Sequence, residues 1–121
     1  LAGLGYLVVR GLSEQRQEYQ VKSMLLDVQK ALQEYHVDQE RYIPRETLTG
    51  AEIISILNDF GFLDPLPMNP WSGEAWKLNG KEPDYLRYET DPNFETYALR
   101  ALEPGTGEVS LEIDSVERPS L

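Results

Sequence analysis

The sequence predicts an α+β fold in which a long N-terminal helix packs on a three- to four-stranded antiparallel sheet, accompanied by a short second helix. Three observations predict it. The first 42 residues contain no proline and carry apolar residues at helical spacing. A capping box opens a second helical segment near residue 50. The last third of the chain consists of short strand-like runs between turns, and Val109–Asp114 alternates strictly between apolar and polar residues, which is typical of a strand with one solvated face.

Length, charge and cysteine content limit the classes of function. A chain of 121 residues suits one domain. The net charge is −10, and 14 of the 21 acidic residues follow residue 50. Nucleic acid binding depends on Lys and Arg, so we do not expect a chain as acidic as this one to bind DNA or RNA. The absence of cysteine excludes disulfides, thiolate metal ligands and cysteine nucleophiles.

The long helix is predicted from near residue 1 to near residue 37, followed by an extended segment that ends at Pro44. Its apolar residues recur at gaps of 4, 3, 4 and 3, which places them on one face. We expect this face to pack the helix on the sheet through Val21, Leu25, Val28, Leu32 and Tyr35. A helix of this length would be roughly 50 Å long and would project beyond its own domain.

The opening stretch, LAGLGYLVVRG, has two interpretations. It is either a short helical overhang packed on the domain or the trailing half of a membrane or filament-core helix. Three glycines, each costing about 1 kcal/mol against Ala in a helix, are tolerated best where helices approach closely away from water. We therefore interpret residues 1–12 as the remnant of a membrane or filament-core segment. Alone, the stretch is too short to cross a bilayer and lacks a signal-peptide pattern.

Residues 43–121 are expected to form a globular head, one structural domain with the second half of the helix, whereas residues 1–42 form the helix itself. Thr49 and Glu52 form the capping box of the second helix, and Gly61 is placed to end it. A proline-rich loop follows. Strands are predicted at residues 76–78, 85–89, 96–102 and 109–114, with turns so short that they favour a meander.

Few residues suggest catalytic chemistry. His36 is the single histidine, so the sequence offers few of the partners that a catalytic triad needs and few of the ligands that a zinc site needs. A solvated or capping role is favoured for it. The carboxylate pairs Glu82/Asp84 and Glu89/Asp91 carry no sign of the burial that a shifted pKa requires. The sequence therefore predicts a protein that is not an enzyme.

Two further features leave alternatives open. Asp91, Asn93 and Glu95 imitate the first ligand positions of a calcium loop, but its glycine and final glutamate are missing. A turn is favoured there; no cofactor is expected, and a less regular calcium site stays possible. Trp71 and Trp76 suit either loop packing onto the core, which is favoured, or a platform for a sugar or peptide.

Several segments, in order, resemble the type IV pilin and pseudopilin family. The stretch AGLGYLVVRG and the helix after it resemble the second half of a pilin's N-terminal helix. The stretch LLDVQKALQEYHVDQERYIP is similar to the place where that helix ends, carried here by Leu25, Ala31, Leu32, Tyr35, Tyr42 and Pro44. NPWSGEAWKL looks like the element that opens the sheet of major pseudopilins, and LRYETDPNFETYALRAL is similar to their closing strands. The family's leader-cleavage site is absent, which implies an N-terminally truncated chain.

The resemblance implies a structural subunit, most like a major pseudopilin, that assembles into a periplasmic filament for type II protein secretion in a bacterium. Such a subunit is anchored in the inner membrane through the missing segment, with a periplasmic head, or lies in an extracellular filament. Its partners are copies of itself and other pseudopilins or pilins. The implied filament-core contacts are Leu4, Leu7, Val8 and Leu12, and charges are expected to pair between subunits from Glu14, Arg16 and Glu18 onward.

Two alternatives remain. The first is a type IV pilus subunit for adhesion, motility or DNA uptake, although the acidic surface disfavours direct DNA binding. The second is a soluble periplasmic binding module that uses Trp71 and Trp76. An upstream basic leader with about 15 more apolar residues would support a pilin, whereas a cleavable signal would support the module.

Overall fold

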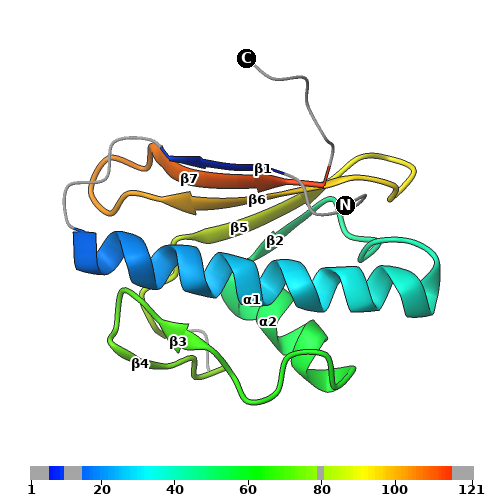
Figure 1. The fold of residues 1–121 in the computed structure, drawn as a ribbon, viewed down its shortest axis with the longest axis horizontal. Coiled ribbons are helices and arrows are strands. Elements are labelled where there is room, and N and C mark those ends of the chain that lie inside the picture. The colour runs from blue at the N-terminus through cyan, green and yellow to red at the C-terminus, as the bar shows by residue number, and fades with distance from the viewer. Residues whose placement is uncertain (1–5, 10–14, 79–80, 116–121) are drawn as a thin grey trace.

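A five-stranded antiparallel sheet, covered on one face by two helices, forms the body of the protein (Figure 1). The computed structural model describes residues 6–9, 15–78 and 81–115. The strand order is β1-β7-β6-β5-β2, and a separate two-stranded ribbon, β3-β4, lies on the other side of the long helix (Figure 1). The structure confirms the α+β class, with one strand more than expected in the main sheet.

The long helix α1, Gln15–Gln39, crosses the sheet and contacts β6 and β7. All five residues of the predicted packing stripe are buried, and none of them is more than 4% exposed. The helix ends where Glu40 adopts a left-handed conformation with φ of 61°. With 25 residues, α1 is about 37 Å long, and it runs alongside the whole sheet (Figure 1).

The predicted helix over residues 1–14 is wrong at Tyr6–Val9, which forms strand β1. This strand pairs antiparallel with β7, Val109–Asp114, so that Tyr6 lies opposite Asp114 and Val9 opposite Leu111. The same glycines that suggested close helix contact explain the outcome, because each of them disfavours a helix. Tyr and Val favour a strand, and the edge of β7 offers unpaired backbone groups.

The second helix begins as predicted. Strand β2, Thr47–Thr49, leads directly into α2, Gly50–Asp59. Thr49 Oγ1 accepts a hydrogen bond from the backbone N–H of Glu52 at 3.3 Å, and Glu52 Oε1 accepts one from the N–H of Thr49 at 3.0 Å. The capping box is thus confirmed, and the cap fixes the direction in which α2 leaves the sheet.

The meander of β5, Leu86–Thr90, β6, Tyr97–Leu102, and β7 matches three of the predicted strands. The fourth prediction, a strand over residues 76–78, is wrong. Strand β4, Glu74–Ala75, instead pairs with β3, Met68–Asn69, and Trp76 turns into the core at 2% exposed. The backbone N–H of Trp76 still donates to the carbonyl of Pro67 at 3.0 Å, and the buried indole fixes the chain against the core at this residue.

Aromatic side chains join the end of α1 to the sheet. Tyr88 donates a hydrogen bond from its phenol to the carbonyl of Ile43 at 3.0 Å, and burial raises the pKa of Tyr88 well above its usual value. The rings of Tyr42 and Tyr97 meet edge to face with centroids 4.7 Å apart. The segment after α1 is therefore fixed on the sheet before β2 begins.

Candidate assembly surfaces

The face of α1 that points away from the core carries a row of exposed apolar side chains. Tyr19 is 74% exposed, Leu26 49% and Val37 81%. At about 100° per residue these three positions point within about 20° of one another, roughly opposite the buried stripe. Tyr19 and Val37 are separated by five full turns, which is about 27 Å along the axis. We call Tyr19, Leu26 and Val37 the outer row.

A groove lies beside each end of the outer row. The first groove lies between α1 and β3 and is lined by Tyr19, Gln20, Ser23, Met24, Asp27 and Met68. The second lies beside Phe62 and is lined by Lys30, Gln33, Glu34, Val37, Asp38 and Phe62. Exposed side chains with grooves beside them are the features through which two helical surfaces interlock. Methionine at the first groove can adapt its shape to a partner.

The opposite face of the sheet carries a ladder of charges. Arg100 on β6 pairs with Glu112 on β7 at 2.6 Å and with Glu89 on β5 at 3.3 Å. Burial alone would lower the pKa of Arg100, but the hydrogen bond to Glu112 and the charge of Glu89 outweigh it and raise that pKa. These charges satisfy one another and hold three strands in register.

The carboxylate pairs considered from the sequence are used for structure. Asp84 accepts hydrogen bonds from the backbone N–H groups of Gly50 and Ala51 at 3.0 and 2.9 Å, so it caps α2 from another loop. Glu82 accepts from Asn69 Nδ2 at 3.3 Å and from the N–H of Lys77 at 3.0 Å.

Asp91, the first residue of the calcium-like segment, forms a turn. Its Oδ1 accepts from the N–H groups of Glu95 and Thr96 at 2.8 and 2.9 Å, and these backbone bonds, from Thr96 foremost, lower the pKa of Asp91. Among the described residues, no group of three or more His, Asp or Glu side chains gathers in a way that could hold a metal ion. The turn interpretation accounts for this loop.

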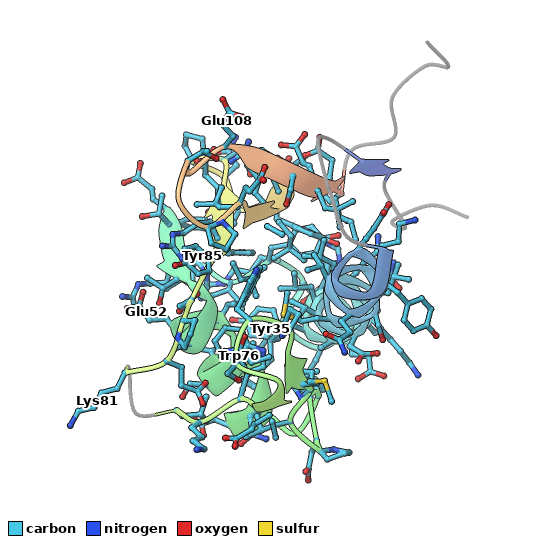
Figure 2. All side chains as sticks on the ribbon, turned by 90° about the vertical axis from the view of Figure 1, so that its left-hand side faces the viewer. Tyr35, Glu52, Trp76, Lys81, Tyr85 and Glu108 are labelled. Atoms are coloured by element: carbon cyan, nitrogen blue, oxygen red, sulfur yellow. The ribbon has the colours of Figure 1, made fainter. Side chains whose placement is uncertain are left out.

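The aromatic and histidine candidates also have structural partners. The ring of His36 lies 4.5 Å from that of Tyr42. Trp76 is buried, as Figure 2 shows, so it is not part of an exposed platform. Trp71 is half-buried against the ring of Tyr85, with centroids 5.4 Å apart. The platform considered from the sequence therefore loses one of its two rings.

The residues assigned to the filament core by resemblance are placed only in part. Leu4 and Leu12 lie outside the described residues. Leu7 and Val8 belong to β1, where they pair with Ile113 and Glu112. Glu14 also lies outside the described residues, and Glu18 pairs with Lys22 within α1 at 3.7 Å.

The outer row was missed from the sequence, although its spacing carried the signal. Residues 7, 11 and 18 positions apart return to nearly the same side of a helix. In a helix whose opposite side forms the core, apolar residues at those separations indicate a second contact face.

Comparison with known proteins gave no relative from which a function could be taken. No family model matches the chain, and no curated protein or solved structure matches it either. No helix within residues 15–78 or 81–115 combines the length and hydropathy that crossing a bilayer requires. The function is therefore argued from the sequence and from the surfaces described above.

Proposed function

We propose that the chain is a pilin-like structural subunit, most similar to a type II secretion pseudopilin, whose α1 packs against neighbouring copies in a periplasmic filament. The observation that carries the proposal is the outer row, Tyr19, Leu26 and Val37, which faces solvent along most of α1. The family resemblance supports it, because a pilin-like helix has one face on its own sheet and the other toward its neighbours.

The outer row can contribute substantially to assembly. Burying a Leu, Val or aromatic side chain completely is worth about 1.5–3 kcal/mol, and these three side chains still have roughly half or more of that burial to gain. Together they would contribute about 3–6 kcal/mol before the entropy of association is subtracted. Contact between the Tyr19 end of the row in one copy and the groove beside Val37 and Phe62 in the next would join two different surfaces, so it is head-to-tail and can propagate into a filament.

The proposal requires β1 to leave the sheet. A filament core of the kind implied by the resemblance needs residues 1–14 to continue α1 as a helix. Among the described elements, β1 contacts β7 and no other. Four residue pairs at about 0.5–1.5 kcal/mol per hydrogen bond would cost about 2–6 kcal/mol to separate. The outer row alone, at about 3–6 kcal/mol before the entropy of association is subtracted, does not cover this cost, so the proposal also requires the apolar N-terminal stretch to be buried against neighbouring copies.

Photocrosslinking in the producing bacterium tests the proposal. Benzoylphenylalanine is placed at Leu26 in the full-length natural chain, and a matched variant carries it at Glu108, which is exposed in the β6–β7 turn (Figure 2). Irradiation of the Leu26 variant should give a ladder of dimers, trimers and larger multimers of this chain, well above the Glu108 variant. Monomer alone, or equal ladders from both variants, would contradict the proposal.

The same strain separates secretion from pilus function. If the subunit serves type II secretion, replacing Leu26 with Asp should retain exported proteins in the periplasm. If it serves a pilus, export should continue while surface filaments disappear from electron micrographs. If both export and surface filaments persist in the Leu26→Asp strain, the outer row has no role in assembly.

A further inference from the structure

Strand β1 is attached to the domain through a single edge. Its four residues pair with residues 111–114 of β7, and among the described elements β7 is its one neighbour. Five residues separate Val9 from Gln15, where α1 begins. Removing β1 therefore breaks one ladder, while β7 stays paired with β6 on its other side.

The edge of β7 is well suited to hold a strand. It alternates between residues of the core face, Leu111 and Ile113, and residues of the charged face, Glu112 and Asp114. Because successive side chains point to opposite faces, a one-residue slip would exchange the faces of the added strand, so the register is strongly specified. The ladder of β6 with β7 also holds this edge in an extended geometry before any strand arrives.

We propose that the β7 edge is a strand-acceptor site that also takes up residues 6–9 from a second copy of this chain. The occupant is identified by the pairing already present, because Tyr6–Val9 displays within one copy the register that it would adopt on another. Two copies that exchange these strands reciprocally form a closed dimer, in which each gives and receives the same contacts. This inference goes beyond the proposed filament and does not depend on it.

The balance between the two pairings is set by concentration. The same backbone bonds form within one copy and between two, so their energies cancel to a first approximation. What remains is the effective concentration of a strand tethered by a short linker, which is on the order of millimolar. Exchange should therefore grow as the protein concentration approaches roughly 1 mM.

Disulfide trapping tests the exchange, since the chain has no cysteine of its own. One variant carries Val8→Cys and the other Glu112→Cys, two positions that are partners in the β1–β7 register. The two are mixed at total concentrations from about 10 μM to about 1 mM and oxidised. Random collision would make the mixed disulfide half of all dimers. Exchange should make it at least five-fold more abundant than either homodimer, and the excess should rise with concentration.

Three controls make the outcome decisive. A double variant with both cysteines should close an intrachain disulfide at low concentration, which shows that substitution preserves the register. Pairing Val8→Cys with Arg87→Cys, on β5, should give the random share. Adding Val8→Pro to the chain that carries Tyr6→Cys, with Asp114→Cys as its partner, should abolish the excess, because proline cannot donate to the ladder.

Two results would overturn the inference. One is an intrachain disulfide that closes fully in the double variant while the mixed disulfide stays at the random share at every concentration. The other is failure of the double variant to close, which would contradict the register itself. Neither result bears on the outer row, so failure of exchange and failure of the filament are distinguishable.

Discussion

Two adjacent leucines on α1 allow the stabilising and assembling faces of the helix to be separated. Leu25 is 0% exposed and lies in the core, whereas Leu26 is 49% exposed and belongs to the outer row. Each is replaced by alanine in a separate variant. Since both substitutions remove the same atoms from neighbouring helical positions, their difference reports the environment and not the helix propensity, which changes little between Leu and Ala.

The expected magnitudes differ several-fold. Leu25→Ala removes a fully buried side chain, which costs about 2–5 kcal/mol because a cavity remains. For a domain of this size, that corresponds to a fall in Tm of roughly 8–25 °C. Leu26→Ala removes a side chain that is half in solvent already, and should cost about 0.7–1.5 kcal/mol. In the assembly assay, Leu26→Ala should lower the multimer yield of folded molecules more than Leu25→Ala does, because Leu26 supplies part of the intersubunit contact.

Urea unfolding followed by circular dichroism measures the first quantity, and multimer yield in the photocrosslinking strain, with the probe at Val37, measures the second. The reasoning is refuted if Leu26→Ala destabilises the isolated domain as much as Leu25→Ala does. It is also refuted if Leu26→Ala leaves the multimer yield unchanged, because the outer row would then have no part in assembly.

Three further predictions concern single contacts. Gly50→Ala should destabilise the domain by about 2–4 kcal/mol in urea unfolding, because the added Cβ would lie 2.5 Å from Asp84 Oδ1 and 2.8 Å from Leu86 Cβ. Gly73→Ala, at φ of +79° in open space, should cost only about 1 kcal/mol, and equal costs would contradict the close approach at Gly50. The Glu52 carboxyl should titrate below its usual pKa in NMR, because it accepts a hydrogen bond from the Thr49 backbone. The domain should lose stability as the pH falls below about 4.5, and Glu52→Gln should remove part of that loss. The sign follows because a lowered folded-state pKa stabilises the fold above the unfolded-state pKa, and that stabilisation is lost on protonation. Arg100→Met should destabilise by about 1–3 kcal/mol, because Glu112 would lose its partner within the sheet, and a neutral effect in thermal unfolding would show that the ladder is dispensable.

The parts of the fold that depend on local spacing could be predicted from the sequence. The stripe from Val21 to Tyr35 follows from helical periodicity, and the capping box follows from two residue types three positions apart. Strands β5 to β7 follow from short runs between turns, and β7 follows also from its strict alternation. In each case the residues that determine the element lie within the element itself.

The parts that depend on distant partners could not be predicted. Asp84 caps α2 from 34 residues away, and Arg100 meets Glu112 only because the strand register places them opposite one another. Trp76 leaves its expected strand because the core beside Gly50 accommodates its ring. Strand β1 was predicted as helix because an apolar, glycine-containing stretch suits either state, and the free edge of β7 decided between them.

The candidate assembly surface could be predicted from the sequence only in part. The outer row lies on an element that the sequence does predict, and its spacing of 7 and 11 residues is visible without a structure. What spacing alone could not show is that the described part of the chain leaves Tyr19, Leu26 and Val37 exposed, since the sheet, α2 and the β3–β4 ribbon were each free to occupy that side.

Cysteine labelling before and after assembly tests the central claim most directly. Leu26→Cys is introduced into the chain, which has no other cysteine, and its rate of maleimide labelling is compared between the isolated domain and cells that make filaments. Glu108→Cys serves as the exposed reference. The account predicts that Leu26→Cys is labelled readily in the isolated domain and at least ten-fold more slowly in the assembled state, while Glu108→Cys is less affected. Equal labelling of Leu26→Cys in both states would contradict it.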